Sequence, residues 1–171
     1  RNTDASLQSI LDSMQWLGLD WDEGPDYGGD FGPYFQSLRM DHYQAAIDRG
    51  VEEGWLYRCF LSPEEAQAMR EQHLNEKRAG RWENPSRELS ADESDVRAAE
   101  GQAFVLRFRV PQDREVKVAD AVRGEVVFRT EEVEDWVAVC ANGLPTYNFC
   151  CAIDDAHMEI SHVIRGEEHL I

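Results

Sequence analysis

The chain has 171 residues, 42% hydrophobic and 30% charged, and a formal net charge of −17. This length suits one ordinary domain, or one domain with an insertion, around a hydrophobic core. The composition argues against disorder, no apolar run is long enough to span a membrane, and the negative charge is unlike that of a general nucleic-acid binder. Taken alone, the charge favours a soluble protein with a small-molecule or protein partner, although a local basic face would still permit contact with RNA.

The first predicted element is an amphipathic helix over residues 3–17, which Thr3 can cap and Gly18 can end. Its apolar residues recur at the helical period: Leu7, Ile10, Leu11, Met14 and Leu17. Residues 16–25 then alternate apolar and acidic side chains. We interpret these acids as solvated, rather than as a metal site, because no third type of ligand is nearby. Residues 25–33 are rich in Gly and Asp and are expected to form an exposed loop.

A second helix is predicted over residues 37–53, and a short buried strand over residues 55–60. The run Ser62-Pro63-Glu64-Glu65 marks the start of another helix. The serine suits the cap, the proline suits the first helical position, and the second glutamate completes a capping box. We expect this helix to reach Lys77 or beyond.

Residues 78–95 are polar and contain proline, so they are expected to form an exposed connection, with a short helix over residues 95–100. The apolar period then changes to two, which is typical of strands. Strands are predicted over residues 104–110, 116–118, 124–129 and 136–140. Together these elements predict an α+β insertion over residues 60–141. Arg107 and Arg109 are expected to share the outward face of its first strand.

The end of the chain, residues 143–171, combines a turn, a part-apolar helix and a short apolar run that ends at Arg165. An arginine at the carboxyl end of a strand in an open α/β sheet points into the crevice where ligands bind. Its guanidinium fits a carboxylate or a phosphate. The simpler alternative is a generic strand–helix unit whose Arg and Glu residues are solvated.

Several runs of this chain closely resemble the glutamate–tRNA ligases, which are class I aminoacyl-tRNA synthetases. The runs are Trp16 to Pro25, Gly32-Pro33-Tyr34-Phe35-Gln36-Ser37, Pro145-Thr146-Tyr147-Asn148-Phe149, Asp154-Asp155 and His162-Val163-Ile164-Arg165-Gly166-Glu167-Glu168-His169. The resemblance covers nearly the whole chain. It therefore outweighs the generic alternative, which would be preferred for a lone Arg-Gly-Glu-Glu.

The resemblance implies an α/β fold, part of a Rossmann-type class I synthetase catalytic domain that is split by an α+β connective insertion. Residues 1–59 would be the rear part of the first Rossmann half. Residues 60–141 would be the connective insertion, which handles the acceptor end of tRNA(Glu) in this family. Residues 142–171 would be the start of the second half.

The resemblance also implies roles for individual residues. Tyr147 and Arg165 are expected to contact the glutamate substrate, with Arg165 reading its side-chain carboxylate and rejecting neutral glutamine. Cys151 falls where some relatives place a polar residue that contacts the substrate. Glu168 and His169 are expected to lie near the adenosine ribose.

Arg107 and Arg109 are candidates for a tRNA-binding basic patch on this acidic chain. The equally weighted alternative is a solvated strand edge whose arginines pair with nearby acids.

The implied reaction consumes ATP, with Mg²⁺, to form glutamyl-adenylate before glutamate is transferred to tRNA. The family's two ATP signatures, of the His-Ile-Gly-His and Lys-Met-Ser-Lys-Ser types, would lie before Arg1 and after Ile171. We therefore expect the chain to be a fragment whose 171 residues do not activate glutamate by themselves.

Many bacterial relatives bind zinc through a Cys-x-Cys pair and a later Tyr and Cys. This chain has Cys59 but Leu61 for the second cysteine, and Trp82 and Ser86 at the later positions. One thiolate cannot make a tetrahedral structural site, so no zinc is predicted. The other cysteines, Cys140, Cys150 and Cys151, form no Cys-x-x-Cys pair and favour reduced thiols in a cytosolic protein.

The leading hypothesis is a catalytic segment of a cytoplasmic, bacterial enzyme that is monomeric when complete and has no membrane partner. The alternative is a non-catalytic connective-type module that binds tRNA or a protein. A third reading, the paralogue that glutamylates a modified tRNA base, ranks lower because such relatives have a shorter, different region at residues 19–37.

Overall fold

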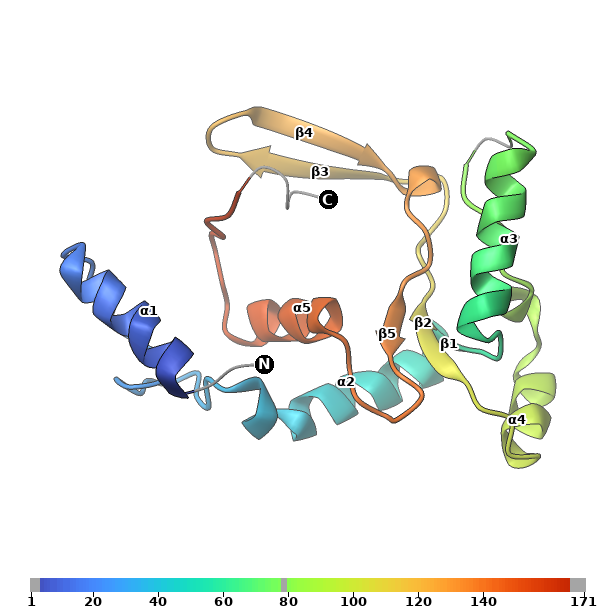
Figure 1. The fold of residues 1–171 in the computed structure, drawn as a ribbon, viewed down its shortest axis with the longest axis horizontal. Helices are drawn as coiled ribbons and strands as arrows, with labels where there is room; N and C mark the ends of the chain where they lie inside the picture. The colour runs from blue at the N-terminus through green and yellow to red at the C-terminus, as the bar shows by residue number, and fades with distance from the viewer. Residues whose placement is uncertain (1–3, 78–79, 167–171) are drawn as a thin grey trace. The chain divides into compact units, whose positions relative to one another are not determined.

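The computed structural model describes residues 4–77 and 80–166 (Figure 1). The elements in chain order are α1 (Asp4–Trp16), η1 (Gln36–Leu38), α2 (Met40–Glu52), β1 (Leu56–Cys59), α3 (Pro63–Asn75), η2 (Pro85–Glu88), α4 (Ala91–Ala99), β2 (Val105–Phe108), β3 (Glu115–Asp120), β4 (Gly124–Arg129), η3 (Thr130–Glu132), β5 (Val137–Val139) and α5 (Tyr147–His157). The chain divides into two compact units, residues 1–40 with 157–171 and residues 41–156. No helix of the described residues is long and apolar enough to cross a membrane.

In the first unit, a loop after α1 is organised around Glu23. Its carboxylate accepts hydrogen bonds from the backbone N–H of Phe31, at 2.7 Å, and from the hydroxyl of Tyr34. Gly29 leaves room for these contacts, because a Cβ at this position would lie 2.2 Å from Glu23 Cγ. The expectation of solvated acids is therefore wrong for Glu23. Arg39, which is fully buried, closes the same loop by donating to two of its carbonyl oxygens.

The second unit has a three-stranded antiparallel sheet in the order β1-β2-β5. Helices α2 and α5 pack against it through a shared core, which comprises Tyr43, Ile47, Leu56, Leu106, Ala138, Val139, Phe149 and Cys150. The close approach of α2 depends on Gly50, since a Cβ there would lie 2.8 Å from the Leu56 side chain. The strands β3 and β4 form a separate antiparallel hairpin.

The helix predicted from the run at residues 62–65 is confirmed. Ser62 Oγ accepts from the Glu65 N–H at 3.1 Å, and the Glu65 carboxylate accepts from the Ser62 N–H at 2.8 Å. This helix ends at Asn75, short of the prediction, and Lys77 adopts a left-handed φ of 50°.

The prediction of an exposed connection over residues 78–95 is wrong. Trp82, Asn84 and Ser86 are buried, and α4 begins at Ala91, capped by Ser90. The side chains of Asn84 and Ser86 are satisfied by hydrogen bonds to Tyr57 and to the backbone of Phe60, so polarity did not mean exposure.

Candidate functional site

The candidate substrate-binding element is α5, and Thr146 fixes where it begins. The Thr146 N–H donates to the carbonyl oxygen of Ala138 at 2.8 Å, and its hydroxyl donates to that of Val137 at 2.9 Å. Both carbonyls belong to β5, so the start of α5 is tied directly to the sheet. A turn containing Gly143, with a φ of 80°, brings the chain back to this point.

Helix α5 has two distinct faces. Phe149 and Cys150 are buried in the core. Tyr147 is 72% exposed, and Cys151, one turn later, is half-buried. Since residues four apart share a helix face, the structure brings Tyr147 and Cys151 together on the side away from the core. Their predicted contact with glutamate remains a prediction.

Arg165 lies in the unit formed by residues 1–40 and 157–171, and it is exposed. The prediction that it follows a strand is wrong, because residues 160–166 form neither a helix nor a strand. A strand exists only as part of a sheet, and no described strand pairs with this run. The predicted ribose-binding residues Glu168 and His169 lie outside the described residues.

Arg107 does not point outward, as its alternation with apolar residues suggested. It is only 5% exposed, its Nη1 donates to the carbonyl oxygen of Asp135 at 2.7 Å, and its guanidinium lies 5.8 Å from the centre of the Trp82 ring. The physical reason is that β2 is the central strand of the sheet. The core covers one face of β2, and Trp82 lies against the arginine on the other.

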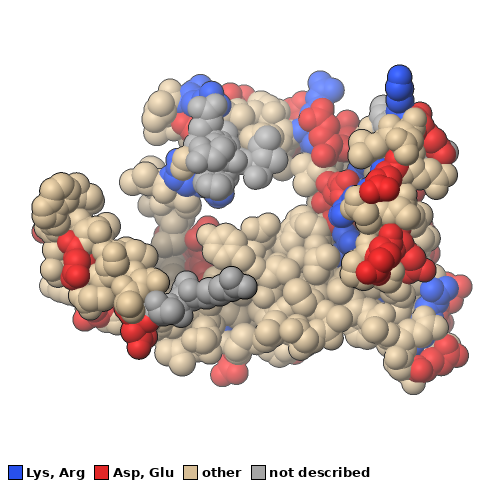
Figure 2. Space-filling view, viewed as in Figure 1, with Lys and Arg blue, Asp and Glu red and all other residues tan. Residues whose placement is uncertain are grey.

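Arg109 is partly exposed. Its guanidinium lies 4.9 Å from the centre of the Tyr57 ring, and its Nε donates to the carbonyl oxygen of Gly54 at 3.2 Å. Over α3 and α4, Figure 2 shows acidic and basic side chains interspersed rather than a broad basic surface. The predicted tRNA contact of Arg107 and Arg109 is not tested by these observations and stays a prediction.

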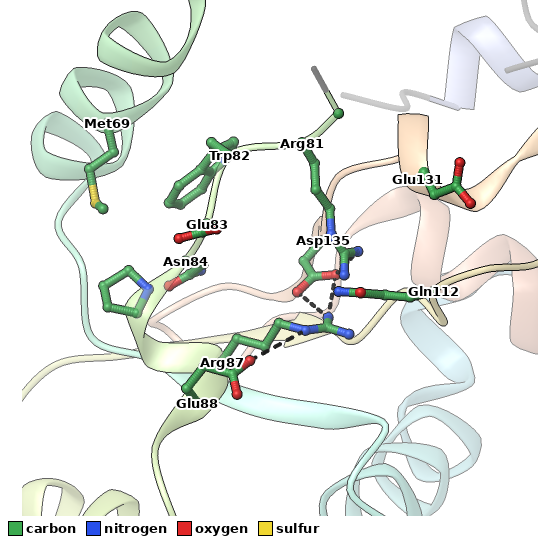
Figure 3. Close-up of a pocket in the computed structure, with 12 residues that line it drawn as sticks. Met69, Arg81, Trp82, Glu83, Asn84, Arg87, Glu88, Gln112, Glu131 and Asp135 are labelled. Carbon is green, nitrogen blue, oxygen red and sulfur yellow. Dashed lines mark hydrogen bonds and ion pairs between the residues drawn. The ribbon is translucent and has the colours of Figure 1, made fainter. Parts of the chain in front are cut away.

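A buried polar cluster surrounds the carboxylate of Asp135 (Figure 3). Arg87 Nη1 donates to it at 2.5 and 2.7 Å, Arg81 Nη1 at 3.1 Å, the Tyr57 hydroxyl at 2.9 Å, and the Val110 N–H at 2.9 Å. Burial, together with the nearby negative charge of Asp135, raises the pKa of Tyr57 above its ordinary value. No local pattern signals this cluster, because most of its members are far apart along the chain.

A cavity of about 680 Å³ opens beside the Asp135 cluster and is lined by Met69, Trp82, Gln112 and both arginines (Figure 3). The two guanidinium groups are turned toward Asp135, which balances part of their charge. Glu83, Glu88 and Glu131 add further negative charge to the wall. The cavity is therefore a poor match for a simple anion.

Cys59 lies next to the same cluster. Asn84 Nδ2 donates to its Sγ at 3.4 Å and to the Tyr57 hydroxyl at 3.1 Å. Asn84 Oδ1 accepts from the N–H of Ser86, whose hydroxyl in turn accepts from the Phe60 N–H. In residues 4–77 and 80–166, no group of three His, Cys, Asp or Glu side chains has an arrangement that could hold a metal ion.

Comparison with known proteins decides the family. The model of the catalytic domain of class I tRNA synthetases (E and Q) matches residues 1–171. The chain belongs to this family. The catalytic domain of class I synthetases is Rossmann-like, so the predicted α/β fold class is confirmed. The division into Rossmann halves and a connective insertion stays a prediction.

Relatives of this synthetase chain include the glutamate–tRNA ligase of Geobacillus stearothermophilus, 44% identical over 171 residues, and glutamate–tRNA ligase 2 of Caldicellulosiruptor saccharolyticus, 43% identical over 170 residues. A solved glutamate–tRNA ligase from Elizabethkingia meningosepticum, in complex with its amino acid, superposes with a TM-score of 0.82 at 32% identity and covers 98% of this chain. The match includes 99% of this chain for the two ligases compared by sequence and 98% for the solved structure. In all three comparisons, the chain spans only 35% of the length of the relative.

Proposed function

We propose that this chain forms part of the catalytic domain of a glutamate–tRNA ligase and supplies one wall of the glutamate site. The observation that carries the proposal is the outward face of α5, where Tyr147 and Cys151 stand one turn apart on a helix fixed to the sheet. The relatives' function supports the same assignment. In the complete protein, the substrates would be glutamate, ATP and the acceptor end of tRNA(Glu).

The chain's own residues suit recognition of glutamate. Tyr147 offers an exposed ring and a hydroxyl, and Arg165 a planar fork of N–H donors that fits the side-chain carboxylate. A site that pairs a cation with this carboxylate rejects glutamine, because the neutral amide cannot compensate the charge. Glu168 and His169 remain the proposed contacts to the ribose. ATP, with Mg²⁺, would supply the activated phosphate.

The reaction has two displacements. The glutamate α-carboxylate attacks the α-phosphorus of ATP and releases pyrophosphate, and a ribose hydroxyl of tRNA then attacks the adenylate and releases AMP. Both steps depend on positioning and on stabilising charge at the reacting atoms. The role of this chain is to bind and orient the amino acid for both steps.

We further infer that this segment does without zinc. At Cys59, an amide hydrogen bond from Asn84 engages the sulfur, and the resemblance puts Leu61 in place of the second cysteine and Ser86 in place of the later one. A single thiolate does not complete a tetrahedral site. Elemental analysis of the purified protein tests this directly, since stoichiometric zinc would contradict it.

The function is tested with the full-length product of the reading frame that contains these residues. Purified protein is incubated with ATP, unfractionated tRNA and either labelled glutamate or labelled glutamine, and acid-precipitable label is counted. The proposal predicts ATP-dependent charging with glutamate and none with glutamine. Charging with glutamine alone, or label on no tRNA, would overturn it.

A further inference from the structure

A hydrogen bond between two residues 111 positions apart links α2 to α5. The hydroxyl of Tyr43 donates to Asp154 Oδ2 at 2.8 Å, and Tyr43 is only 1% exposed. Its ring belongs to the core shared by α2, α5 and the sheet. A buried hydroxyl requires a partner, and here the partner is a carboxylate on the helix that carries Tyr147 and Cys151.

This bond is a second polar attachment of α5, in addition to the packing of Phe149 and Cys150 in the core. The first is at its start, where Thr146 is hydrogen-bonded to β5. Asp154 lies eight residues further along, which corresponds to about 12 Å of helix. Two attachments separated along the axis fix the rotation of the helix about that axis, which a single attachment at one end would not.

The rotation of α5 determines where its outward face points. Side-chain tips lie about 5–6 Å from a helix axis, so a rotation of about 20° displaces them by about 2 Å. Misplacement of a substrate-positioning group by about 1 Å can cost roughly 100-fold in rate. Tyr147 and Cys151 are therefore sensitive to the contact that Tyr43 makes with Asp154, further along the same helix.

We propose that Tyr43 is a positioning residue for glutamate, which it never contacts, and that it acts through Asp154 by fixing the rotation of α5. This inference rests on the proposed function of the α5 face. It predicts that loss of the Tyr43 hydroxyl affects binding of glutamate more than binding of ATP. If Tyr43 had a purely structural role, loss of its hydroxyl would lower stability and affect the binding of glutamate and ATP equally.

The structure provides a matched control in Tyr57. Its hydroxyl is also buried and also donates to a carboxylate, Asp135 Oδ2, at 2.9 Å. The substitution Tyr57→Phe therefore removes the same kind of hydrogen bond from the same compact unit, but from a cluster on the other side of the sheet from α5.

The test measures glutamate and ATP KM values and the Tm of the full-length product. For Tyr43→Phe we expect a glutamate KM raised about 5- to 10-fold, the equivalent of one hydrogen bond, with the ATP KM changed less than about twofold. Tyr57→Phe is expected to lower the Tm comparably and to change the glutamate KM less than about twofold. Asp154→Ala, which removes the acceptor at a partly exposed position, should reproduce the effect of Tyr43→Phe, and the double variant should be no worse than the more affected single variant.

Three results would overturn the inference: an unchanged glutamate KM in Tyr43→Phe and Asp154→Ala, an equal rise in both tyrosine variants, or additive effects in the double variant. If Tyr43→Phe does not fold, Asp154→Ala still decides the outcome. Failure of the proposed function has a different signature, because the unmodified protein would then not use glutamate at all.

Discussion

Arg87 and Asp135 form a buried ion pair in which one guanidinium nitrogen lies 2.5 and 2.7 Å from the two carboxylate oxygens. Asp135 is 7% exposed and also accepts hydrogen bonds from Arg81, Tyr57 and the backbone of Val110. Through these partners, one carboxylate joins β1, the end of β2, η2 and the segment before β5. Through Arg81 and Arg87, Asp135 is therefore the main polar contact of the segment that was predicted to be an exposed connection.

Loss of the Asp135 charge should destabilise the protein strongly. Asp135→Asn removes the buried counter-charge of two guanidinium groups and leaves Arg87 only the exposed Glu88, 4.0 Å away. Removing one partner of a buried pair costs about 3–5 kcal/mol. The neighbouring Glu134 makes a partly exposed pair with Arg70, for which Glu134→Gln should cost about 1 kcal/mol or less. Urea unfolding of both variants measures the difference, and equal losses would contradict a structural role for the cluster.

The hydrogen bond from Tyr34 to Glu23 predicts a pH dependence at high pH. Burial, and then the hydrogen bond and charge of Glu23, raise the pKa of Tyr34 to about 12. Because the folded pKa exceeds the unfolded value of about 10, this tyrosine contributes stability below about pH 10 that is lost as the pH rises through about 12. The free energy of unfolding of the protein and of Tyr34→Phe should therefore converge over this interval. A difference that stays constant to the highest pH would contradict it.

Arg165 is expected to be needed for activity and not for stability. In the full-length product, Arg165→Ala should lower kcat/KM for glutamate roughly 100-fold, because a charged group on the substrate loses its partner. The Tm should change little, because the Arg165 side chain is exposed. Arg49→Ala removes another exposed arginine, one that pairs with Glu53 just after the end of α2, and serves as the control. Comparable losses of activity and Tm would make Arg165 a structural residue.

The two arginines of the predicted tRNA patch should separate in their effects. Arg107→Ala empties a buried position beside Trp82 and leaves the Asp135 carbonyl without a donor, so we expect a loss of about 2–3 kcal/mol in the free energy of unfolding. Arg109→Ala should leave stability nearly unchanged. If Arg109 contacts a tRNA phosphate, this variant should raise the KM for tRNA and reduce its salt dependence. An unchanged KM and salt dependence would remove Arg109 from the interface.

The sequence predicted what local chemistry determines. The capping box of Ser62 and Glu65 depends on residues three apart, so its pattern is visible without a structure. Tyr147 and Cys151, which the resemblance rather than the spacing assigned to the substrate, share a helix face for a similarly local reason, because they are four residues apart. Neither arrangement requires knowledge of a distant part of the chain.

The sequence failed where partners come from far along the chain. The alternation of apolar residues over 104–110 predicts that Arg107 points outward. Trp82, 25 positions earlier in the chain, covers that face of the strand. Asn84 lies in the segment predicted to be exposed, and no local pattern singles out Asp135, yet their hydrogen bonds run to β1 and to the backbone just after β2. For Tyr43 and Asp154, 111 residues apart, no local pattern could reveal the contact.

The central claim, that the outward face of α5 binds glutamate, is tested most directly by a crystal structure of the full-length product with glutamate bound. We expect the amino acid to lie beside α5, with the Tyr147 hydroxyl about 3 Å from a polar atom of the ligand and the Arg165 guanidinium about 3 Å from its side-chain carboxylate. Glutamate bound at a site that touches neither Tyr147 nor Arg165 would contradict it.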